Sequence, residues 1–305
     1  NKGSEIWNVV NILDFHCLGD WASFTRAWCD GYGNHLVRDP ALLGGHLRRE
    51  GLILRRTKQE VLTELPPKRR LVQEIDADDR VYRELMRPVI ELLGSLRVLH
   101  PEAKERAMLE EQVGRGERQA TGVAKAPFVA AFVRALLDNG EKVLLFAHHH
   151  AVMDIYKKEL VSYRPVFITG RETTQQKDDA VTRFMGEKTN LCVISLRAAS
   201  GLNLQRASCV VFGELDWSPA VHSQAEDRAH RMGQKDSILC YYLVAPQGSD
   251  RDMQDALGLK VSQFVALMGD KTPELSGVQD AQRAAKAHIE KMLKQYDAAQ
   301  TNDRV

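Results

Sequence analysis

The chain has 305 residues, of which 44% are hydrophobic, and its formal net charge is +1. This length suits one large domain or two modest ones, and the hydrophobic content is that of an ordinary globular protein. The near-neutral charge excludes bulk attraction to nucleic acid, so a nucleic-acid surface would need local clustering of basic residues. The sequence contains no run of eighteen apolar residues and no signal peptide, so it predicts no membrane partner.

Cysteine usage indicates a reducing compartment. The five cysteines form no C-x-x-C pair and stand at positions 17, 29, 192, 209 and 240. Cys192 and Cys209 fall inside apolar runs, where a thiol behaves as a small hydrophobe. The pattern argues against a disulfide or zinc framework and predicts a cytoplasmic or nuclear protein.

Three consecutive histidines, His148, His149 and His150, follow an apolar run. Adjacent side chains point in different directions, so three neighbouring imidazoles are poorly placed to share one metal ion. An ordinary loop is the favoured interpretation, and the sequence predicts no metal site.

The first 75 residues divide into a helical part and a basic part. Within residues 1–45, Ser4 is a good N-cap, and apolar residues follow at helical spacing at positions 6, 9, 10 and 13. Residues 46–70 carry eight Lys or Arg and three Glu, a local net charge of +5. A solvated linker and a brace that contacts an anionic partner both fit this composition.

Residues 76–138 have helical patterns. One apolar stripe is formed by Leu85, Val89, Leu92 and Leu93, and a second by Phe128, Ala131, Phe132 and Leu136. Asn139 and Gly140 then form a typical helix C-terminus. Between the stripes, the polar segment 101–124 has glycines at 114, 116 and 122, which predicts partial disorder.

Strand and helix patterns alternate over residues 141–270. Apolar runs at 143–146, 165–168, 193–194, 210–212 and 239–244 are separated by helical patterns, which is typical of a doubly wound parallel sheet. Ligands of such sheets bind beyond the carboxyl ends of the strands, where the loop 195–204 and the region after Phe212 are expected. A last amphipathic helix is marked by Ile289, Met292, Leu293 and Tyr296.

Two arginines stand out in the helix predicted after the W-S-P sequence at 217–219. Arg228 and Arg231 are three residues apart, so a helix would place them on one face, with Gln224 on the same side. Paired guanidinium groups suit a polyphosphate, because each offers planar donors that are always charged. A solvated charged helix is the alternative, because Glu226 and Asp227 alternate with the arginines.

A longer string surrounds these arginines. S-L-R-A-A-S-G-L-N-L at 195–204, followed by D-W-S-P and Q-A-E-D-R-A-H-R-M-G-Q, resembles motifs five and six of the Swi/Snf family of superfamily-two ATPases. K-V-L-L-F at 142–146 resembles motif four, and L-R-R-T-K with L-P-P-K resembles the connector between the two lobes of that family. Lys177 stands where arginine is usual, and Ser200 where a second glycine is usual. The family drives translocation along double-stranded DNA.

The resemblance implies a RecA-like α/β fold, a doubly wound parallel sheet with helical insertions and a C-terminal helix. Residues 1–45 would be the helical tail of a first lobe, and 46–75 a basic linker or brace between lobes. A helical protrusion would occupy 76–125, the second RecA-like lobe 126–270, and a brace helix 271–305. The chain would then be the C-terminal half of a larger motor, inactive by itself.

The resemblance also implies a role for each matched residue. Arg228 and Arg231 would be arginine fingers that reach the ATP γ-phosphate, held by Gln224 and Asp227. Nucleotide binding and coupling would fall to Gly201, Leu202, Asn203 and Trp217. Contacts with DNA would fall to Ser195, Arg197, Arg55 and Arg56.

The substrate and ion implied are ATP and Mg²⁺. Neither G-x-x-x-x-G-K-[ST] nor a D-E-x-H or D-E-x-D tetrapeptide occurs in the chain, so the first lobe is expected to bind most of the phosphates and the Mg²⁺. The expected partners are double-stranded DNA, the first lobe of the same protein and further proteins.

Two other functions remain open. One is a non-catalytic RecA-like docking module, and the other is a strand-separating superfamily-two helicase. The sequence also leaves open what a translocase of this kind would remodel: a nucleosome, a replication fork, a polymerase or phage DNA.

Overall fold

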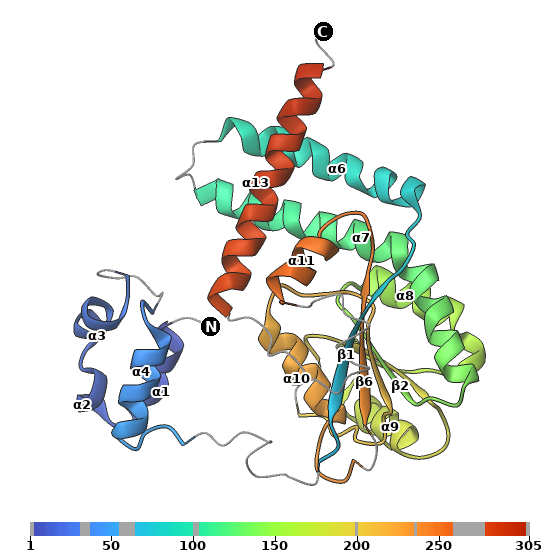
Figure 1. Cartoon of the computed structure of the whole chain (residues 1–305), viewed down its shortest axis with the longest axis horizontal. Helices are drawn as coiled ribbons and strands as arrows, with labels where there is room; N and C mark the ends of the chain where they lie inside the picture. Colours follow the sequence, from blue (N-terminus) through green and yellow to red (C-terminus); the bar gives the residue numbers. More distant parts are fainter. Residues whose placement is uncertain are drawn as a thin grey trace. The chain divides into compact units, whose positions relative to one another are not determined.

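The computed structural model describes residues 3–30, 37–54, 65–99, 104–198, 201–234, 237–258 and 278–302. The chain divides after residue 64 into two compact units. The first contains the helices α1 (Gly3–Leu13), α2 (Phe15–Leu18), α3 (Trp21–Trp28) and α4 (Pro40–Arg49), blue in Figure 1. Its small core includes Val10, Phe24 and Leu47. Helix α4 runs through residue 45, so the boundary expected there does not separate two structural parts.

The second unit is built on one six-stranded sheet. The strands are β1 (Lys68–Glu74), β2 (Val143–Ala147), β3 (Val166–Ile168), β4 (Leu191–Ser195), β5 (Cys209–Phe212) and β6 (Ile238–Val244). Their order is β1-β6-β5-β2-β4-β3, and every pair is parallel. Strands β2 to β6 are the five predicted apolar runs, and the doubly wound parallel sheet is confirmed.

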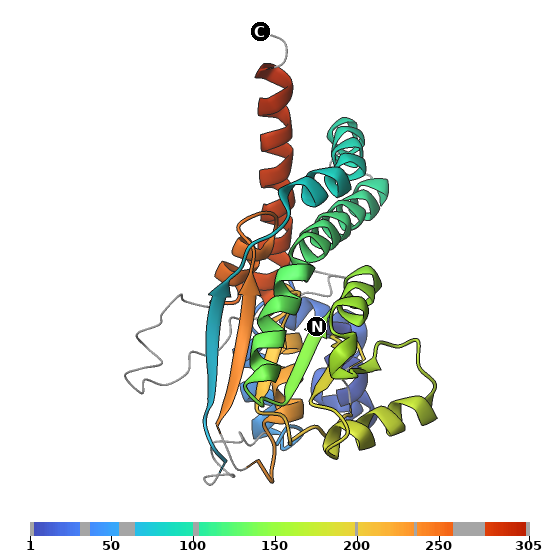
Figure 2. The same ribbon diagram turned by 90° about the vertical axis from the view of Figure 1, so that its right-hand side faces the viewer.

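Helices cover both faces of this sheet (Figures 1 and 2). One face packs against α9 (Thr174–Met185), α10 (Pro219–Ala229) and α11 (Asp250–Ala256). The other packs against α8 (His150–Glu159) and the second half of α7 (Lys104–Asp138). A 3₁₀ turn, η1 (Val161–Tyr163), follows α8. The central strands β2, β4 and β5 are buried throughout, which explains their nearly continuous apolar runs.

Strand β1 was not expected. The sequence predicts a linker or brace over residues 46–75, but Lys68–Glu74 pairs with β6 along its whole length (Figure 2). The basic composition did not suggest a strand. Lys68 and Arg70 lie in it because they donate hydrogen bonds to the buried carboxylate of Glu226. The predicted linker 46–75 therefore includes seven residues that belong to the sheet.

A helical layer stands beside one end of the sheet, formed by α6 (Asp79–Val98), the first half of α7 and α13 (Val278–Asn302) (Figure 1). The predicted stripe at Ile289, Met292, Leu293 and Tyr296 packs against α6 and α7. Helix α7 is continuous across residue 125, where the sequence predicts a boundary between protrusion and lobe.

The prediction of partial disorder over 101–124 was wrong for residues 104–124, which are helical. The glycines there permit close packing. A Cβ at Gly116 would lie 2.8 Å from Cγ2 of Val89, and a Cβ at Gly122 would collide with the Glu214 carboxylate. One stretch of α7 has the length and composition of a membrane span, but more than half of it is buried inside the protein. Such burial is typical of a core helix.

A buried carboxylate fixes α10 to the sheet edge. Glu226 is fully buried, and Arg70 donates to it from Nε and Nη2, both at 2.7 Å. Lys68 donates from Nζ at 2.7 Å and Tyr242 from its hydroxyl at 2.9 Å. Burial opposes ionisation, but the hydrogen bonds and charges of Arg70 and Lys68 hold the pKa of Glu226 at about 2.

Removal of this charge should destabilise the second unit strongly. Glu226→Gln leaves Arg70 and Lys68 facing a neutral amide, and breaking one partner of a buried pair costs about 3–5 kcal/mol. Urea unfolding of the whole chain measures the loss. Glu290→Gln, at an exposed position of α13, should change the free energy of unfolding by less than about 0.5 kcal/mol. An equal effect of the two substitutions would contradict the assignment.

The effect of Glu226→Gln should also depend on pH. The folded-state pKa of Glu226 lies below its ordinary value, so the carboxylate stabilises the fold above pH 4.5 and loses this effect as the pH falls toward about 2. The difference in free energy of unfolding between wild type and Glu226→Gln should shrink by about 1 kcal/mol between about pH 6 and about pH 3.5. A difference that stays constant over this range would show that the charge is not the cause.

Candidate functional site

Most of the predicted site residues that the structure describes fall into two groups, one near each end of helix α10. Its first residue, Pro219, follows the loop 213–218 that leaves the carboxyl end of β5. Just beyond its last residue, His230 donates from Nε2 to the carbonyl of Pro66, 2.7 Å away. Pro66 precedes β1, so this end of α10 lies beside the amino end of the sheet. Eleven residues at 1.5 Å each separate the two ends by about 16 Å.

The arginine end, residues 228–231 with 201–204, joins two segments that are distant in sequence. The backbone N–H of Leu204 donates to the carbonyl of Arg228 at 3.0 Å. Nη1 of Arg231 donates to the carbonyl of Leu202 at 3.4 Å. Gly201 has a φ of +77°, a conformation that glycine adopts without strain. Gly201 and Asn203 are exposed, and Leu202 packs against the core of the lobe.

Arg231 is not on the helix, contrary to the expectation that both arginines share one helix face. Helix α10 ends at Ala229, and Arg231 lies in the following turn, where its N–H bonds to the carbonyl of Ala229. Gly233, with a φ of +95°, continues this turn. His230, between the helix and Arg231, bonds to the carbonyl of Pro66. Because the helix has ended before Arg231, the spacing of three residues does not place the two arginines on one helix face.

The two arginines differ in exposure. Arg231 is exposed and Arg228 is half-buried. Nε of Arg228 is buried and has no hydrogen-bond partner among the described residues. A buried donor without a partner is costly, and a guanidinium group is well suited to a phosphate oxygen. The arginine end therefore has the donors for an anionic ligand.

Gln224 and Asp227 are the other predicted catalytic residues. Gln224 is exposed on α10. Asp227 is half-buried, and its Oδ1 lies 3.5 Å from Nζ of Lys68. The sequence gave no role to Glu226, which entered only the alternative of a solvated charged helix. A signal existed: Glu226 has helical spacing with His222 and Ala229, and all three are buried.

Ser195, Arg197 and Trp217 lie away from the arginine end: Ser195 is the last residue of β4, and Arg197 and Trp217 follow the carboxyl ends of β4 and β5. Arg197 is exposed, as a contact with DNA requires. Ser195 ends β4 and is only 5% exposed, so a phosphate could reach its hydroxyl only if the adjoining turn moved. Trp217 is half-buried and packs against the core of the lobe. The carboxyl-end rule thus holds for these three residues. It does not hold for the last part of the expected loop 195–204, because Leu202 and Leu204 bond to the arginine segment beside the amino end of the sheet.

Glu214 connects the loops that follow β2 and β5. Its Oε2 accepts the backbone N–H groups of His148 and His149 at 2.7 and 2.8 Å, and its Oε1 lies 2.6 Å from Nδ1 of His149. Burial opposes ionisation, but these bonds, led by that of the His149 side chain, lower the pKa of Glu214. Burial and then the charge of His149 lower the pKa of His148 to about 4. Two of the three histidines therefore organise a loop, as an ordinary structural role predicts.

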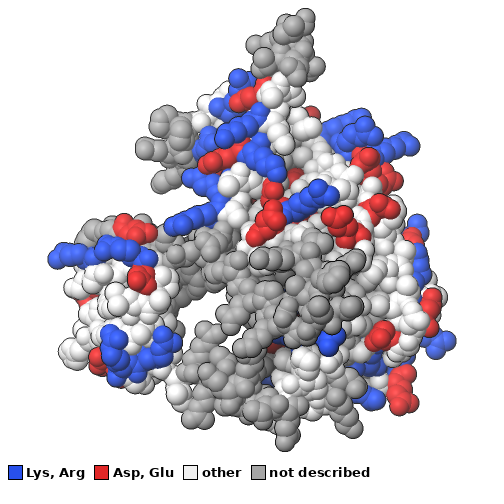
Figure 3. Space-filling view, viewed as in Figure 1, with Lys and Arg blue, Asp and Glu red and all other residues white. Residues whose placement is uncertain are grey.

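Arg55 and Arg56, which the sequence predicts to contact DNA, lie outside the described residues. Within the described ranges, no group of three or more His, Cys, Asp or Glu side chains could hold a metal ion. On the face shown in Figure 3, Lys and Arg gather over α6 and α13 with Asp and Glu between them.

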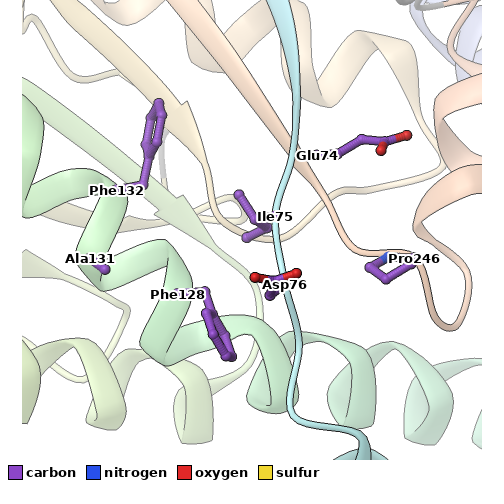
Figure 4. A pocket seen from close by; sticks show the side chains of 7 residues that line it. All are labelled: Glu74, Ile75, Asp76, Phe128, Ala131, Phe132 and Pro246. Atoms are coloured by element: carbon purple, nitrogen blue, oxygen red, sulfur yellow. The ribbon is translucent and has the colours of Figure 1, made fainter.

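A shallow hollow lies where β1 and β6 end (Figure 4). It is lined by Glu74, Ile75, Asp76, Phe128, Ala131, Phe132 and Pro246, and none of these is a predicted site residue. A second hollow, on α6, is lined by Arg80, Arg83, Glu84 and Arg87. Neither hollow adjoins the arginine end.

Comparison with known sequences identifies relatives. The family described as the helicase conserved C-terminal domain matches residues 128–233. The human DNA annealing helicase and endonuclease ZRANB3 is 31% identical over 272 residues, covering 85% of this chain and 25% of the relative. A Drosophila melanogaster protein, the SWI/SNF-related matrix-associated actin-dependent regulator of chromatin subfamily A-like protein 1, is 30% identical over 259 residues, covering 81% and 33%. The chain thus spans a quarter to a third of these relatives.

Comparison with solved structures identifies the fold. The C-terminal part of the Fun30 ATPase domain matches with a TM-score of 0.54 at 15% identity, covering 75% of this chain and 98% of that chain. The Sulfolobus solfataricus SWI2/SNF2 ATPase core in complex with double-stranded DNA matches with a TM-score of 0.53 at 19% identity, covering 88% and 61%. The expected RecA-like fold is confirmed. The chain belongs to the Swi/Snf family of superfamily-two ATPases and contains the C-terminal helicase lobe of that family.

Proposed function

We propose that this chain is the C-terminal half of an ATP-dependent translocase that moves along double-stranded DNA. A first RecA-like lobe of the same protein completes the ATP site, and Arg228 and Arg231 reach the γ-phosphate across the cleft between the lobes. The observation that carries the proposal is the arginine end: residues 201–204 are hydrogen-bonded to the segment that bears both arginines. A cytoplasmic or nuclear location accords with this function.

The chemistry assigned to the arginines is electrostatic. Negative charge on the transferring phosphoryl group is stabilised by planar, permanently charged donors, and an arginine finger is worth roughly 10³–10⁵ in rate. This role is supported by the buried Nε of Arg228, which has no hydrogen-bond partner in the part of the chain that the structure describes. Gln224 and Asp227, on the preceding turn, hold the arginines and respond to nucleotide. Gly201, Leu202 and Asn203 bring the backbone close to the nucleotide.

ATP and Mg²⁺ are shared unequally between the lobes. The described residues of this chain offer guanidinium groups to phosphate oxygens but no cluster of metal ligands. Mg²⁺ is therefore assigned to the first lobe, where it would neutralise phosphate charge. The contribution of this chain is to place Arg228 and Arg231 and to exclude water when the lobes close.

DNA contact is assigned to the carboxyl end of the sheet. Arg197 is exposed there, and Trp217 couples this surface to the start of α10. Contacts with phosphates carry no sequence information, so binding should be independent of sequence and sensitive to salt. One structural relative was solved in complex with double-stranded DNA, which supports a duplex as the partner.

Substitution of either arginine should abolish the motor. In the two-lobe protein, Arg228→Ala or Arg231→Ala should lower the duplex-stimulated turnover of ATP by roughly 10³–10⁵. Arg228→Lys should be nearly as damaging, because lysine keeps the charge but loses the planar fork. Arg206→Ala, an exposed arginine that bonds to the carbonyl of Met185, is the matched control and should retain turnover. Normal stimulation in Arg228→Ala would leave only the docking-module alternative.

The chain alone should not be an ATPase. With the first lobe absent, most phosphate contacts are missing, so titration of the chain with ATP and duplex DNA should give no turnover above background. Phosphate release from the isolated chain, compared with its Arg228→Ala variant, tests this expectation. Turnover that depends on Arg228 in the isolated chain would refute the half-site.

Arg197 should add one phosphate contact. Arg197→Ala should weaken duplex binding by the two-lobe protein equally for unrelated sequences, and the slope of log K against log salt should decrease by about 1. The control is Arg134→Ala, near the end of α7, where its Nη1 lies 3.4 Å from Oε2 of Glu159 at the end of α8. An unchanged slope would place the DNA elsewhere.

Strand separation is the remaining alternative. A strand-separating helicase would prefer single strands and displace an annealed oligonucleotide, whereas the proposed translocase is stimulated by the intact duplex. The name of the human relative is that of an annealing helicase, and annealing joins two strands into a duplex, which supports the duplex as the substrate.

A further inference from the structure

One histidine holds α13 to the second unit by charge. His288 is 6% exposed and lies between two carboxylates. Its Nε2 is 2.9 Å from Oε2 of Glu117 on α7, and its Nδ1 is 2.5 Å from Oδ2 of Asp252 on α11. A neutral imidazole can donate from only one nitrogen, whereas an imidazolium donates from both. Two carboxylate contacts therefore call for the charged form.

The same histidine touches the loop that precedes α10. Its ring centroid lies 5.7 Å from that of Trp217, at an interplanar angle of 47°. This distance falls within the range over which a cation is attracted to an indole face. The neighbouring Asp216 lies 3.8 Å from Arg118, which follows Glu117 on α7. Two adjacent residues of α7 thus hold the histidine and the loop 213–218.

These contacts form a continuous mechanical connection. Helix α13 crosses α6 and α7 (Figure 1) and packs there through apolar side chains. His288, a buried polar residue of α13, packs against Trp217. The loop 213–218 leads into α10, which carries Arg228 near its far end. A shift of α13 would therefore displace the start of α10, the helix that leads to the arginines.

We propose that His288 is a positioning residue: as an imidazolium held by Glu117 and Asp252, it keeps α13 against Trp217 and so fixes the loop at the start of α10. The consequence for turnover rests on the proposed function. The contact between His288 and Trp217 does not, and it can be measured in the chain by itself.

The groups around His288 determine its pH dependence. Glu117 faces it from α7, Asp252 from α11 and Lys291 from its own helix, where Nζ lies 2.9 Å from Asp252. Burial lowers the pKa of His288, but its bonds and charge interactions, first with Glu117 and then with Asp252, raise it above the ordinary value. Burial and then the charge of Glu117 raise the pKa of Tyr82 on α6.

The raised pKa of His288 determines how its stabilising contribution changes with pH. A raised folded-state pKa means that the contribution of His288 is fully present below the ordinary histidine value of about 6.5 and is lost as the pH rises through the folded-state pKa. Helix α13 should therefore be held at neutral pH and loosened in alkali.

The first test uses fluorine NMR of the whole chain labelled with 5-fluorotryptophan. The chain has four tryptophans, and Trp217→Phe identifies the relevant resonance. In wild type this resonance should move in one transition with a midpoint above about pH 6.5. His288→Gln should abolish the transition, and His288→Lys should abolish it while keeping the low-pH position. Asp252→Asn, which removes one carboxylate, should move the midpoint to lower pH.

An internal control is present in the first unit. Trp28 stacks on His46 with centroids 5.2 Å apart, and its resonance should be untouched by substitutions at 288. A Trp217 resonance that ignores pH in wild type, or an unchanged transition in His288→Gln, would overturn the inference whatever the protein does with ATP.

The second test measures turnover in the two-lobe protein. His288→Gln should lower duplex-stimulated turnover at least about fivefold at neutral pH, and His288→Lys should restore it and remove its alkaline decline. Normal stimulation in both wild type and His288→Gln would overturn the positioning role alone. Absence of duplex stimulation in wild type would overturn the proposed function together with that role, and the NMR result would still show whether the contact with Trp217 exists.

Discussion

A buried carboxylate, Glu226, is the constraint on which the arrangement of the second unit depends. An ionised group without access to water is tolerated only where its charge and its hydrogen bonds are met. Arg70, Lys68 and Tyr242 meet them from two adjacent strands, so these contacts hold α10 against this edge of the sheet. Arg228 follows by two residues, about 200° around the helix, so inward placement of Glu226 directs Arg228 away from the sheet.

This docking gives a structural role to two basic residues of the segment before residue 75. A strand alternates its side chains between two faces. Lys68 and Arg70 point toward Glu226, whereas Arg69, between them, is exposed. Part of the local positive charge is therefore neutralised by Glu226 inside the fold. Less of it is available to a nucleic acid than the composition suggests. The strand also makes the sheet six-stranded, with β6 protected by β1 on its outer side.

Helix α10 connects two regions with different tasks. At the end beside Pro66, one backbone hydrogen bond and one bond from the Arg231 side chain join the arginine segment to residues 201–204. At the other end, Trp217 meets His288 of α13 and the polar residues of α7. A rigid helix transmits displacement between its ends, so α10 links the helical layer mechanically to the arginines. The polar contacts of Glu226 and His288 hold the helices in a defined position, because hydrogen bonds depend on direction. Apolar packing alone would let the helices shift along one another.

The sequence by itself determined the local features: five of the six strands, the apolar stripes of the helices, the free cysteines and the motif segments that identify the family. These depend on periodicity and on short spacing, which neighbouring residues encode. Tertiary structure alone decided that a basic linker ends in a strand, that glycines in α7 serve helix contact and not disorder, and that Arg231 leaves the helix. It also decided which carboxylates are buried. The reason is distance along the chain: Glu226 meets Arg70 across 156 residues and His288 meets Glu117 across 171. No local pattern records such pairs, because burial and partners are settled only when the separate segments pack together.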